Sequence, residues 1–334
     1  MKRRVVVTGV GVVAPNGHGK IEFVNSLKNG LSGIRSIPKL SELNFACQVG
    51  GVPPNVSEKA KEYFSEESLL AMSETMIFAG IAAIDAWKDA GLDLPEPDGE
   101  IVNEDSGCIV GVGIGGMEVI AEKLVPMVNA GKTKRMGSTL VEQVMASGVS
   151  AKLSGIFALG NQVTTNSSAC NTGTEAIVDS FHRIQNGYAD KMIAGGSEGA
   201  SPYIWAGFDS MKVLCNKFND APEKASRPLS ATACGFIPGS GSGILLLESL
   251  ESAQKRGAKI YAEVLAGTVN SGGHRLGGSM TAPSPKSVQK CIQNTIKDAN
   301  IRPDEIDLIN GHLTATFADP LEVENWFNAL GVTV

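Results

Sequence analysis

The stretch from Val163 to Ile177 most constrains what this chain can fold into, because a β-branched run passes through small polar residues into a helical pattern. Val163 to Thr165 predicts a strand, and apolar residues spaced i, i+4 and i+7 from Ile177 predict a helix. Cys170 therefore lies where a strand turns into a helix. Free backbone N–H groups and the helix dipole favour an anion there and can lower the pKa of a cysteine. A small buried cysteine fits the same position.

The composition indicates a globular protein without a charge-based preference for nucleic acid. The 334 residues are 43% hydrophobic and 19% charged, with a formal net charge of −6. This balance gives no reason to expect nucleic acid or an acidic membrane surface as a partner. No apolar stretch approaches the roughly 20 residues that cross a bilayer, so we expect no membrane span. We expect a cytoplasmic location, where cysteines stay reduced.

The six cysteines lie at least 19 positions apart and show no metal-site spacing. A chain of this length does not need disulfide bonds to fold. We therefore expect no metal site and reduced thiols.

Strand and helix patterns alternate along the chain, which predicts an α/β fold with a largely parallel sheet covered on both faces. One long amphipathic helix is predicted over residues 66–90.

The run from Gly9 to Ala14 follows the first strand and matches the dinucleotide pattern G-x-G-x-x-G/A. That pattern needs a helix that begins at once, with its N-terminus on the pyrophosphate. Residues 15–19 form a turn instead, and no strand ending in an acidic residue follows about 20 positions later. A nicotinamide-dependent oxidoreductase is therefore disfavoured.

Six segments occur in a telling order along the chain: Val5–Gly9, Gly113–Gly116, Asn166–Cys170, Ala194–Glu198, Ser226–Pro228 and Lys255–Glu263. Together they resemble the β-ketoacyl-ACP synthase family of the thiolase fold, and most closely its elongating condensing enzymes. The resemblance covers essentially the whole chain and implies a thiolase-like, duplicated α/β/α/β/α layered fold. On this basis we expect residues 1–250 to form an N-terminal half with inserted helices, and residues 251–334 to form part of a C-terminal half.

The resemblance also implies the reaction. In this family a cysteine takes an acyl group from a carrier protein as a thioester. Two histidines and a lysine then promote decarboxylation of malonyl-carrier and a Claisen condensation, in fatty-acid or polyketide-type biosynthesis. Matched by motif, Cys170 is the nucleophile and His312 is the first histidine.

The same motifs imply the substrate contacts. Thr314 and Thr316 match threonines that contact the pantetheine arm, and Ile114 and Phe208 resemble residues that line the acyl pocket. The substrates travel on the phosphopantetheine of acyl carrier protein, so we expect no further cofactor.

A basic loop contains Lys132, Lys134 and Arg135. Charge alone would favour a solvated surface turn, but the resemblance implies a surface that meets the acidic acyl carrier protein. It also implies a homodimer, or a heterodimer with a related ketosynthase chain.

Three departures from the family stand out. Leu313 replaces a glycine after His312, and Leu229-Ser230 replaces an aromatic-Asp pair. The family also continues through a lysine, a second histidine and a glycine-rich loop, which no motif after His312 supplies before Val334. The remaining histidines, His18, His182 and His274, match no such motif.

We therefore expect an incomplete C-terminal half, completed by a second polypeptide. The alternative to an active synthase is a non-catalytic or incomplete subunit that binds carrier protein or a partner chain.

Overall fold

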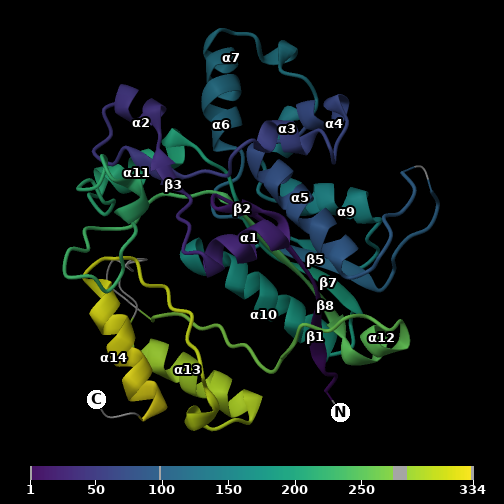
Figure 1. Ribbon diagram of the computed structural model, residues 1–334. Coiled ribbons are helices and arrows are strands. Elements are labelled where there is room, and N and C mark those ends of the chain that lie inside the picture. The colour runs from purple at the N-terminus through teal and green to yellow at the C-terminus, as the bar shows by residue number, and fades with distance from the viewer. Residues whose placement is uncertain (1, 98, 274–283, 332–334) are drawn as a thin grey trace.

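A computed structural model describes residues 2–97, 99–273 and 284–331 of the chain (Figure 1). His274, which the sequence places in a loop, lies outside the described residues.

The described residues form strands and helices along the whole chain. The strands are β1 (Val5–Ala14), β2 (Gly17–His18), β3 (Ile34–Ser36), β4 (Val49–Gly51), β5 (Ser106–Gly111), β6 (Val163–Thr164), β7 (Lys191–Glu198), β8 (Gly241–Ser249) and β9 (Ala262–Val264). The α-helices are α1 (Gly19–Lys28), α2 (Pro38–Glu42), α3 (Val56–Ala60), α4 (Glu66–Leu70), α5 (Glu74–Asp89), α6 (Met117–Val119), α7 (Val125–Asn129), α8 (Leu140–Val144), α9 (Gly148–Phe157), α10 (Thr172–Gln185), α11 (Pro202–Ser210), α12 (Leu250–Lys255), α13 (Pro285–Ala299) and α14 (Ala318–Leu330).

The central sheet has seven strands in the order β2-β1-β8-β7-β5-β6, with β9 also paired to β1. β5 runs parallel to β6 and β7, whereas β8 runs antiparallel to both β1 and β7. The expectation of a largely parallel sheet is therefore wrong. The reason is the connection after β7, which returns the chain to the end of the sheet where β7 stops, so that Gly241 pairs with Glu198 and β8 runs back.

Helices cover both faces of this sheet, as the thiolase-like layering requires. Side chains of α5 and α9 pack with those of β1, β5, β7 and β8 in the largest core cluster. α10 covers the other face, where Phe181 and Ile184 are buried against residues of β1, β5 and β7.

Close approach of α5 explains the glycine pattern in β1. A Cβ at Gly9 would lie 2.0 Å from the Ala86 carbonyl oxygen, and a Cβ at Gly11 would lie 1.8 Å from that of Ala82. These glycines let a helix backbone lie directly on the strand, which accounts for a pattern that resembles a dinucleotide site.

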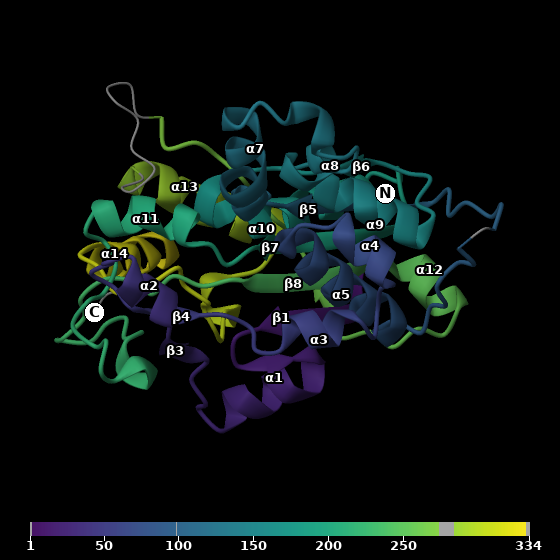
Figure 2. The same ribbon diagram turned by 90° about the horizontal axis from the view of Figure 1, so that it is seen from above.

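The C-terminal part contributes β9, α13 and α14, and these two helices pack against each other. In both views they lie on the side of the molecule opposite α9 and α12 (Figures 1 and 2). The His182 Nε2 atom of α10 lies 3.1 Å from the Gly267 carbonyl oxygen and links the two parts. The division at residue 250 stays a prediction. No helix in the described ranges is long and apolar enough to cross a membrane.

Candidate active site

Cys170 lies on a sharp turn immediately before α10, as the sequence predicts. Ala169 has a φ of 53°, a left-handed conformation that an L-residue rarely adopts. The Thr172 hydroxyl stabilises the turn, because it accepts from the Ser168 N–H at 2.8 Å and donates to the Ala169 carbonyl at 2.6 Å. This geometry leaves Cys170 exposed at the N-terminus of a 14-residue helix.

The turn is also fixed to the neighbouring strand β5. The Asn166 carbonyl accepts from the Val112 N–H at 3.1 Å, and the Asn166 amide donates to the Thr172 carbonyl at 2.9 Å. Gly111 is required here, since a Cβ at this position would lie 2.3 Å from Thr172 Cγ2. These contacts fix the position of residues 166–172, called the nucleophile turn below, relative to the sheet.

The side chains of Cys170 and His312 approach each other, although 142 positions separate them in the sequence. The neighbouring His312 side chain lowers the pKa of Cys170 by hydrogen bonding and charge, and this outweighs the burial that would raise that pKa. The Cys170 side chain in turn raises the pKa of His312 against the effect of burial. Opposite shifts of this kind favour a thiolate–imidazolium pair, which is the reactive form of a cysteine nucleophile.

Glu322 of α14 holds the backbone at the histidine. Its carboxylate accepts from the His312 N–H at 2.6 Å and from the Leu313 N–H at 2.9 Å. Leu313 has a φ of 37°, in the region that favours glycine, which explains why a glycine suits this position better. Sequence reasoning missed Glu322; the available signal was an acidic residue on the helix that follows the histidine.

The two threonines lie on the same loop as His312. Their hydroxyl oxygens are 2.9 Å apart, and both side chains, Thr314 and Thr316, are half-buried. The Ala315 carbonyl between them accepts from the Gly235 N–H at 2.9 Å, which ties this loop to the segment before β8. Contact of these threonines with a pantetheine arm stays a prediction.

Ile114 and Phe208 come from different elements, and each side chain is 38% exposed. Ile114 lies in the turn after β5, and its N–H donates to the Glu198 carboxylate at 3.2 Å. Phe208 lies on α11 and makes an edge-to-face contact with Phe236, with ring centroids 5.5 Å apart. Their role in an acyl pocket stays a prediction.

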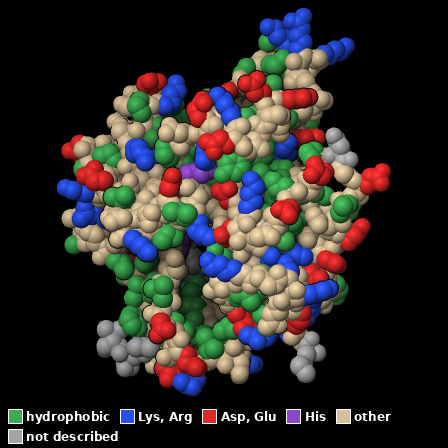
Figure 3. Space-filling view, turned by 45° about the vertical axis from the view of Figure 1, so that its right-hand side comes forward, with side chains coloured by type: hydrophobic (Ala, Val, Ile, Leu, Met, Phe, Trp, Pro, Cys, Tyr) green, Lys and Arg blue, Asp and Glu red, His purple; other side chains and the backbone are tan. Residues whose placement is uncertain are grey.

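The basic loop follows α7 and projects from the molecule. Lys132, Lys134 and Arg135 are all exposed and line one shallow hollow. Figure 3 shows Lys and Arg side chains gathered at the top of the molecule, at the height where Figure 1 places α7. This surface is suited to an acidic partner.

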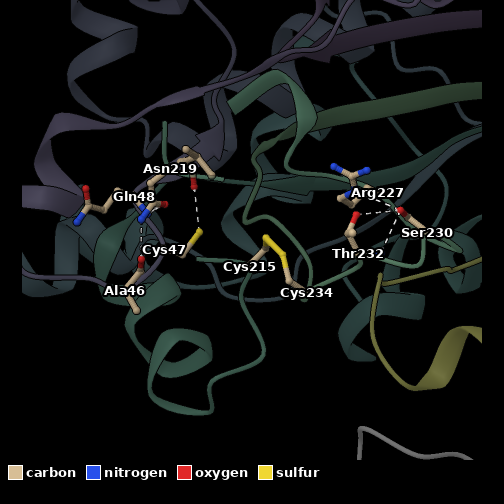
Figure 4. Close-up of a disulfide and its surroundings, with 10 residues drawn as sticks. Ala46, Cys47, Gln48, Cys215, Asn219, Arg227, Ser230, Thr232 and Cys234 are labelled. Carbon is tan, nitrogen blue, oxygen red and sulfur yellow. Dashed lines mark hydrogen bonds between the residues drawn. A yellow bond between two sulfur atoms is a disulfide. The ribbon is translucent and has the colours of Figure 1, made fainter. Parts of the chain in front are cut away.

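Cys215 and Cys234 form a disulfide, so the expectation of reduced thiols is wrong for this pair (Figure 4). Backbone pairing brings them together: the Cys215 N–H donates to the Phe236 carbonyl, and the Phe236 N–H donates to that of Val213. The resulting Cα–Cα distance is 4.9 Å, which a disulfide requires. The 19 positions between these two cysteines in the sequence do not indicate that the fold brings them together.

The other two histidines in the described ranges have other neighbours. The His18 ring lies 6.3 Å from that of Tyr63, and burial lowers its pKa. His182 contacts the Gly267 carbonyl. Within those ranges, no group of three His, Cys, Asp or Glu side chains is arranged to hold a metal ion.

Comparison with known proteins identifies the family. The model of the beta-ketoacyl synthase N-terminal domain matches residues 2–253, and that of the C-terminal domain matches residues 261–333. A 3-oxoacyl-[acyl-carrier-protein] synthase 2 of Synechocystis is 34% identical over 336 residues, which cover 99% of this chain and 77% of that protein.

Solved structures of ketosynthases have the same fold. A beta-ketoacyl synthase from Burkholderia phymatum superimposes with a TM-score of 0.88 at 28% identity, covering 99% of this chain and 79% of that one. A type II polyketide ketosynthase, in complex with its acyl-carrier protein, gives 0.84 at 29% identity, covering 99% and 78%. These matches confirm the thiolase-like fold and the resemblance that the sequence motifs carry. The chain belongs to the beta-ketoacyl synthase family of acyl-transferring condensing enzymes.

Proposed function

We propose that this chain acts as a β-ketoacyl-[acyl-carrier-protein] synthase, with Cys170 as acyl acceptor and His312 as its catalytic partner. The approach of these two side chains at the N-terminus of α10, with opposite shifts of their pKa values, carries the proposal. Relatives of similar sequence are named 3-oxoacyl-[acyl-carrier-protein] synthases, which supports the carrier-bound substrate class.

In the first half-reaction the Cys170 thiolate adds to the carbonyl of an acyl thioester. The Cys170 backbone N–H stabilises the negative charge on the oxygen of the tetrahedral intermediate. Collapse of this intermediate breaks the carbon–sulfur bond to pantetheine, and the leaving sulfur takes the proton from the His312 imidazolium. The acyl group is then a thioester on Cys170, and His312 is neutral.

In the second half-reaction His312 donates a hydrogen bond to the carbonyl oxygen of the malonyl thioester. This bond stabilises the enolate that forms when carbon dioxide leaves. The enolate carbon attacks the acyl-Cys170 carbonyl, a carbon–carbon bond forms, and the Cys170 thiolate is released. Thr314 and Thr316 hold the pantetheine arm during this step, and both substrates arrive on phosphopantetheine without a further cofactor.

Mass spectrometry of the intact chain after incubation with an acyl-carrier protein tests the first step. Wild type gains one acyl group and Cys170→Ala gains none, and acylated wild type then releases carbon dioxide from malonyl-carrier. Absence of acylation in wild type would refute the proposal.

Leu313 favours a second candidate function, that of a non-catalytic or incomplete subunit. Its strained backbone lies next to His312, where the family has glycine. A non-catalytic or incomplete subunit would accept the acyl group on Cys170 without releasing carbon dioxide. The same experiment therefore separates the two functions.

We propose acyl carrier protein as the partner, docked on Lys132, Lys134 and Arg135. Support comes from the exposure of this loop and from a solved relative in complex with its carrier protein. Reversing Lys132 and Lys134 to Glu should raise KM for acyl-carrier roughly tenfold, and less at high salt, because exposed charges are screened. Lys28→Glu, an exposed lysine on α1, is the matched control. An equal effect on a free pantetheine thioester would refute the docking role.

We further propose a dimer, formed by two copies or with a related ketosynthase chain, in the cytoplasm. Sedimentation velocity of the pure chain distinguishes a dimer from a monomer.

A further inference from the structure

The turn after β5 is held by a carboxylate that the reaction does not use. Glu198 ends β7, and its side chain accepts from the Gly113 N–H at 3.0 Å and from the Ile114 N–H at 3.2 Å. On its other side, the Gly113 carbonyl accepts from the Ser167 hydroxyl at 3.2 Å. Ser167 belongs to the nucleophile turn, so one peptide unit connects Ile114 to both β7 and the Cys170 segment.

A second carboxylate continues the connection from this turn. Glu118 lies on α6, two residues after Gly116, and accepts from the Glu74 N–H at 3.0 Å. Glu74 is the first residue of α5, where a negative charge stabilises the free N–H groups of the helix.

The third carboxylate, that of Glu74, connects α5 to the segment after β7. The Glu74 side chain accepts from the Ala200 N–H at 2.5 Å. Ala200 follows Glu198 by two residues and precedes α11, the helix that carries Phe208. Three carboxylate-to-amide links thus join the turn of Ile114 to the segment that leads into the helix of Phe208.

The carboxylates of Glu198 and Glu74 are largely buried, which changes the pKa of each. Desolvation raises the pKa of Glu198 to about 7, although the Gly113 and Ile114 N–H groups oppose it. Desolvation also raises the pKa of Glu74 to about 7, with the Ala200 N–H opposing and the Glu118 charge adding to the rise. Hydrogen bonds to a partly desolvated carboxylate are strong, and an amide that loses such an acceptor is left unsatisfied.

We propose that Glu198, Glu118 and Glu74 are positioning residues that fix Ile114 relative to Phe208 and thereby set which acyl chain lengths Cys170 accepts. This inference rests on the proposed function, because it assumes that these two side chains line the acyl pocket. The carboxylates touch no reacting atom, so they affect long acyl groups, which must pass these side chains, and spare short ones.

The test compares acylation of Cys170 by acetyl- and decanoyl-pantetheine in three variants of the full chain. Glu198→Gln removes the charge of the acceptor and replaces one carboxylate oxygen by an amide donor. It should lower the decanoyl-to-acetyl rate ratio roughly tenfold, the effect of one such hydrogen bond. Glu74→Gln should lower the ratio about threefold, because it acts through Ala200. Glu122→Gln, an exposed glutamate near Glu118, is the control and should leave the ratio unchanged.

Alkylation of Cys170 by iodoacetamide separates positioning from general damage. All three variants should react at the wild-type rate within about twofold, because this probe is small. A parallel fall of acetyl and decanoyl rates, or an unchanged ratio in Glu198→Gln, would overturn the specificity role.

Amide hydrogen exchange tests the coupling without any acyl substrate. Glu74→Gln should increase exchange in peptides covering residues 199–203 and also in those covering 112–117, which Glu74 does not touch. A change confined to 199–203 would overturn the coupling. If wild type is alkylated but never acylated, the proposed function fails with the specificity role, while the exchange data still decide the coupling.

Discussion

Removal of the His312 imidazole gives the sharpest test of how the Cys170 thiolate is stabilised. The hydrogen bond from His312 is the largest cause of the lowered Cys170 pKa, and the charge of the imidazolium adds to it. His312→Ala removes both effects and leaves the burial that raises this pKa. The thiolate should therefore form only at higher pH in the variant.

The size of the effect on reactivity can be worked out from an ordinary thiol. A cysteine with a pKa near 8.5 is about 3% ionised at pH 7, so the thiolate population would fall about thirtyfold from a fully ionised wild type. A more basic thiolate is also a better nucleophile, with a Brønsted coefficient of about 0.4–0.5, which returns roughly half of that loss on a logarithmic scale. Alkylation at neutral pH should therefore slow by about fivefold.

The assay is the rate of Cys170 alkylation by iodoacetamide as a function of pH, followed by peptide mass. Cys108 does not interfere, because burial raises the pKa of its thiol to about 12. The wild-type advantage should be present below the titration midpoint of the variant. It should reverse above that midpoint, where both thiols are ionised and the more basic thiolate of the variant is the better nucleophile. His182→Gln, which keeps a hydrogen-bonding side chain near the Gly267 carbonyl, is the matched control. Identical pH profiles for wild type and His312→Ala would refute the reasoning.

Three further changes test stability, each by denaturant unfolding. Arg256→Met should cost about 3 kcal/mol, because it leaves the fully buried Glu248 carboxylate without the ion pair that, with Ser252, lowers its pKa despite burial. Replacing Cys215 and Cys234 by Ser should cost about 3 kcal/mol for a loop of this length, and reductant should abolish the difference. Gly11→Ala should cost about 3 kcal/mol or more, because its methyl group would overlap a backbone carbonyl of α5.

Local signals predicted the nucleophile turn correctly. The β-branched run, the small polar residues and the helical spacing after Cys170 all act over a few residues, and the structure has a strand, a turn and a helix there. The pairing of Cys170 with His312 came from the motif resemblance, since no local pattern connects residues so far apart.

Other features depended on tertiary contacts that sequence patterns do not carry. The helix predicted over residues 66–90 is two helices, because Ser73 takes an extended backbone conformation and caps α5. The direction of β8 follows from where a long connection returns to the sheet. Glu198 and Glu322 look like ordinary acidic residues until the fold places their carboxylates against pairs of backbone N–H groups.

The proposed catalytic pair, Cys170 and His312, is flanked by strained backbone. Ala169 precedes the nucleophile and Leu313 follows the histidine, and both have positive φ values that cost about 1–2 kcal/mol each in an L-residue. Each is held by a hydrogen-bonding group from a helix: Thr172 at the start of α10 and Glu322 on α14. Because relaxation of either residue would move the side chain of Cys170 or His312, Thr172 and Glu322 help to hold the thiol and the imidazole in contact. We therefore expect the reactivity of Cys170 to depend on how firmly α14 is held against the rest of the protein.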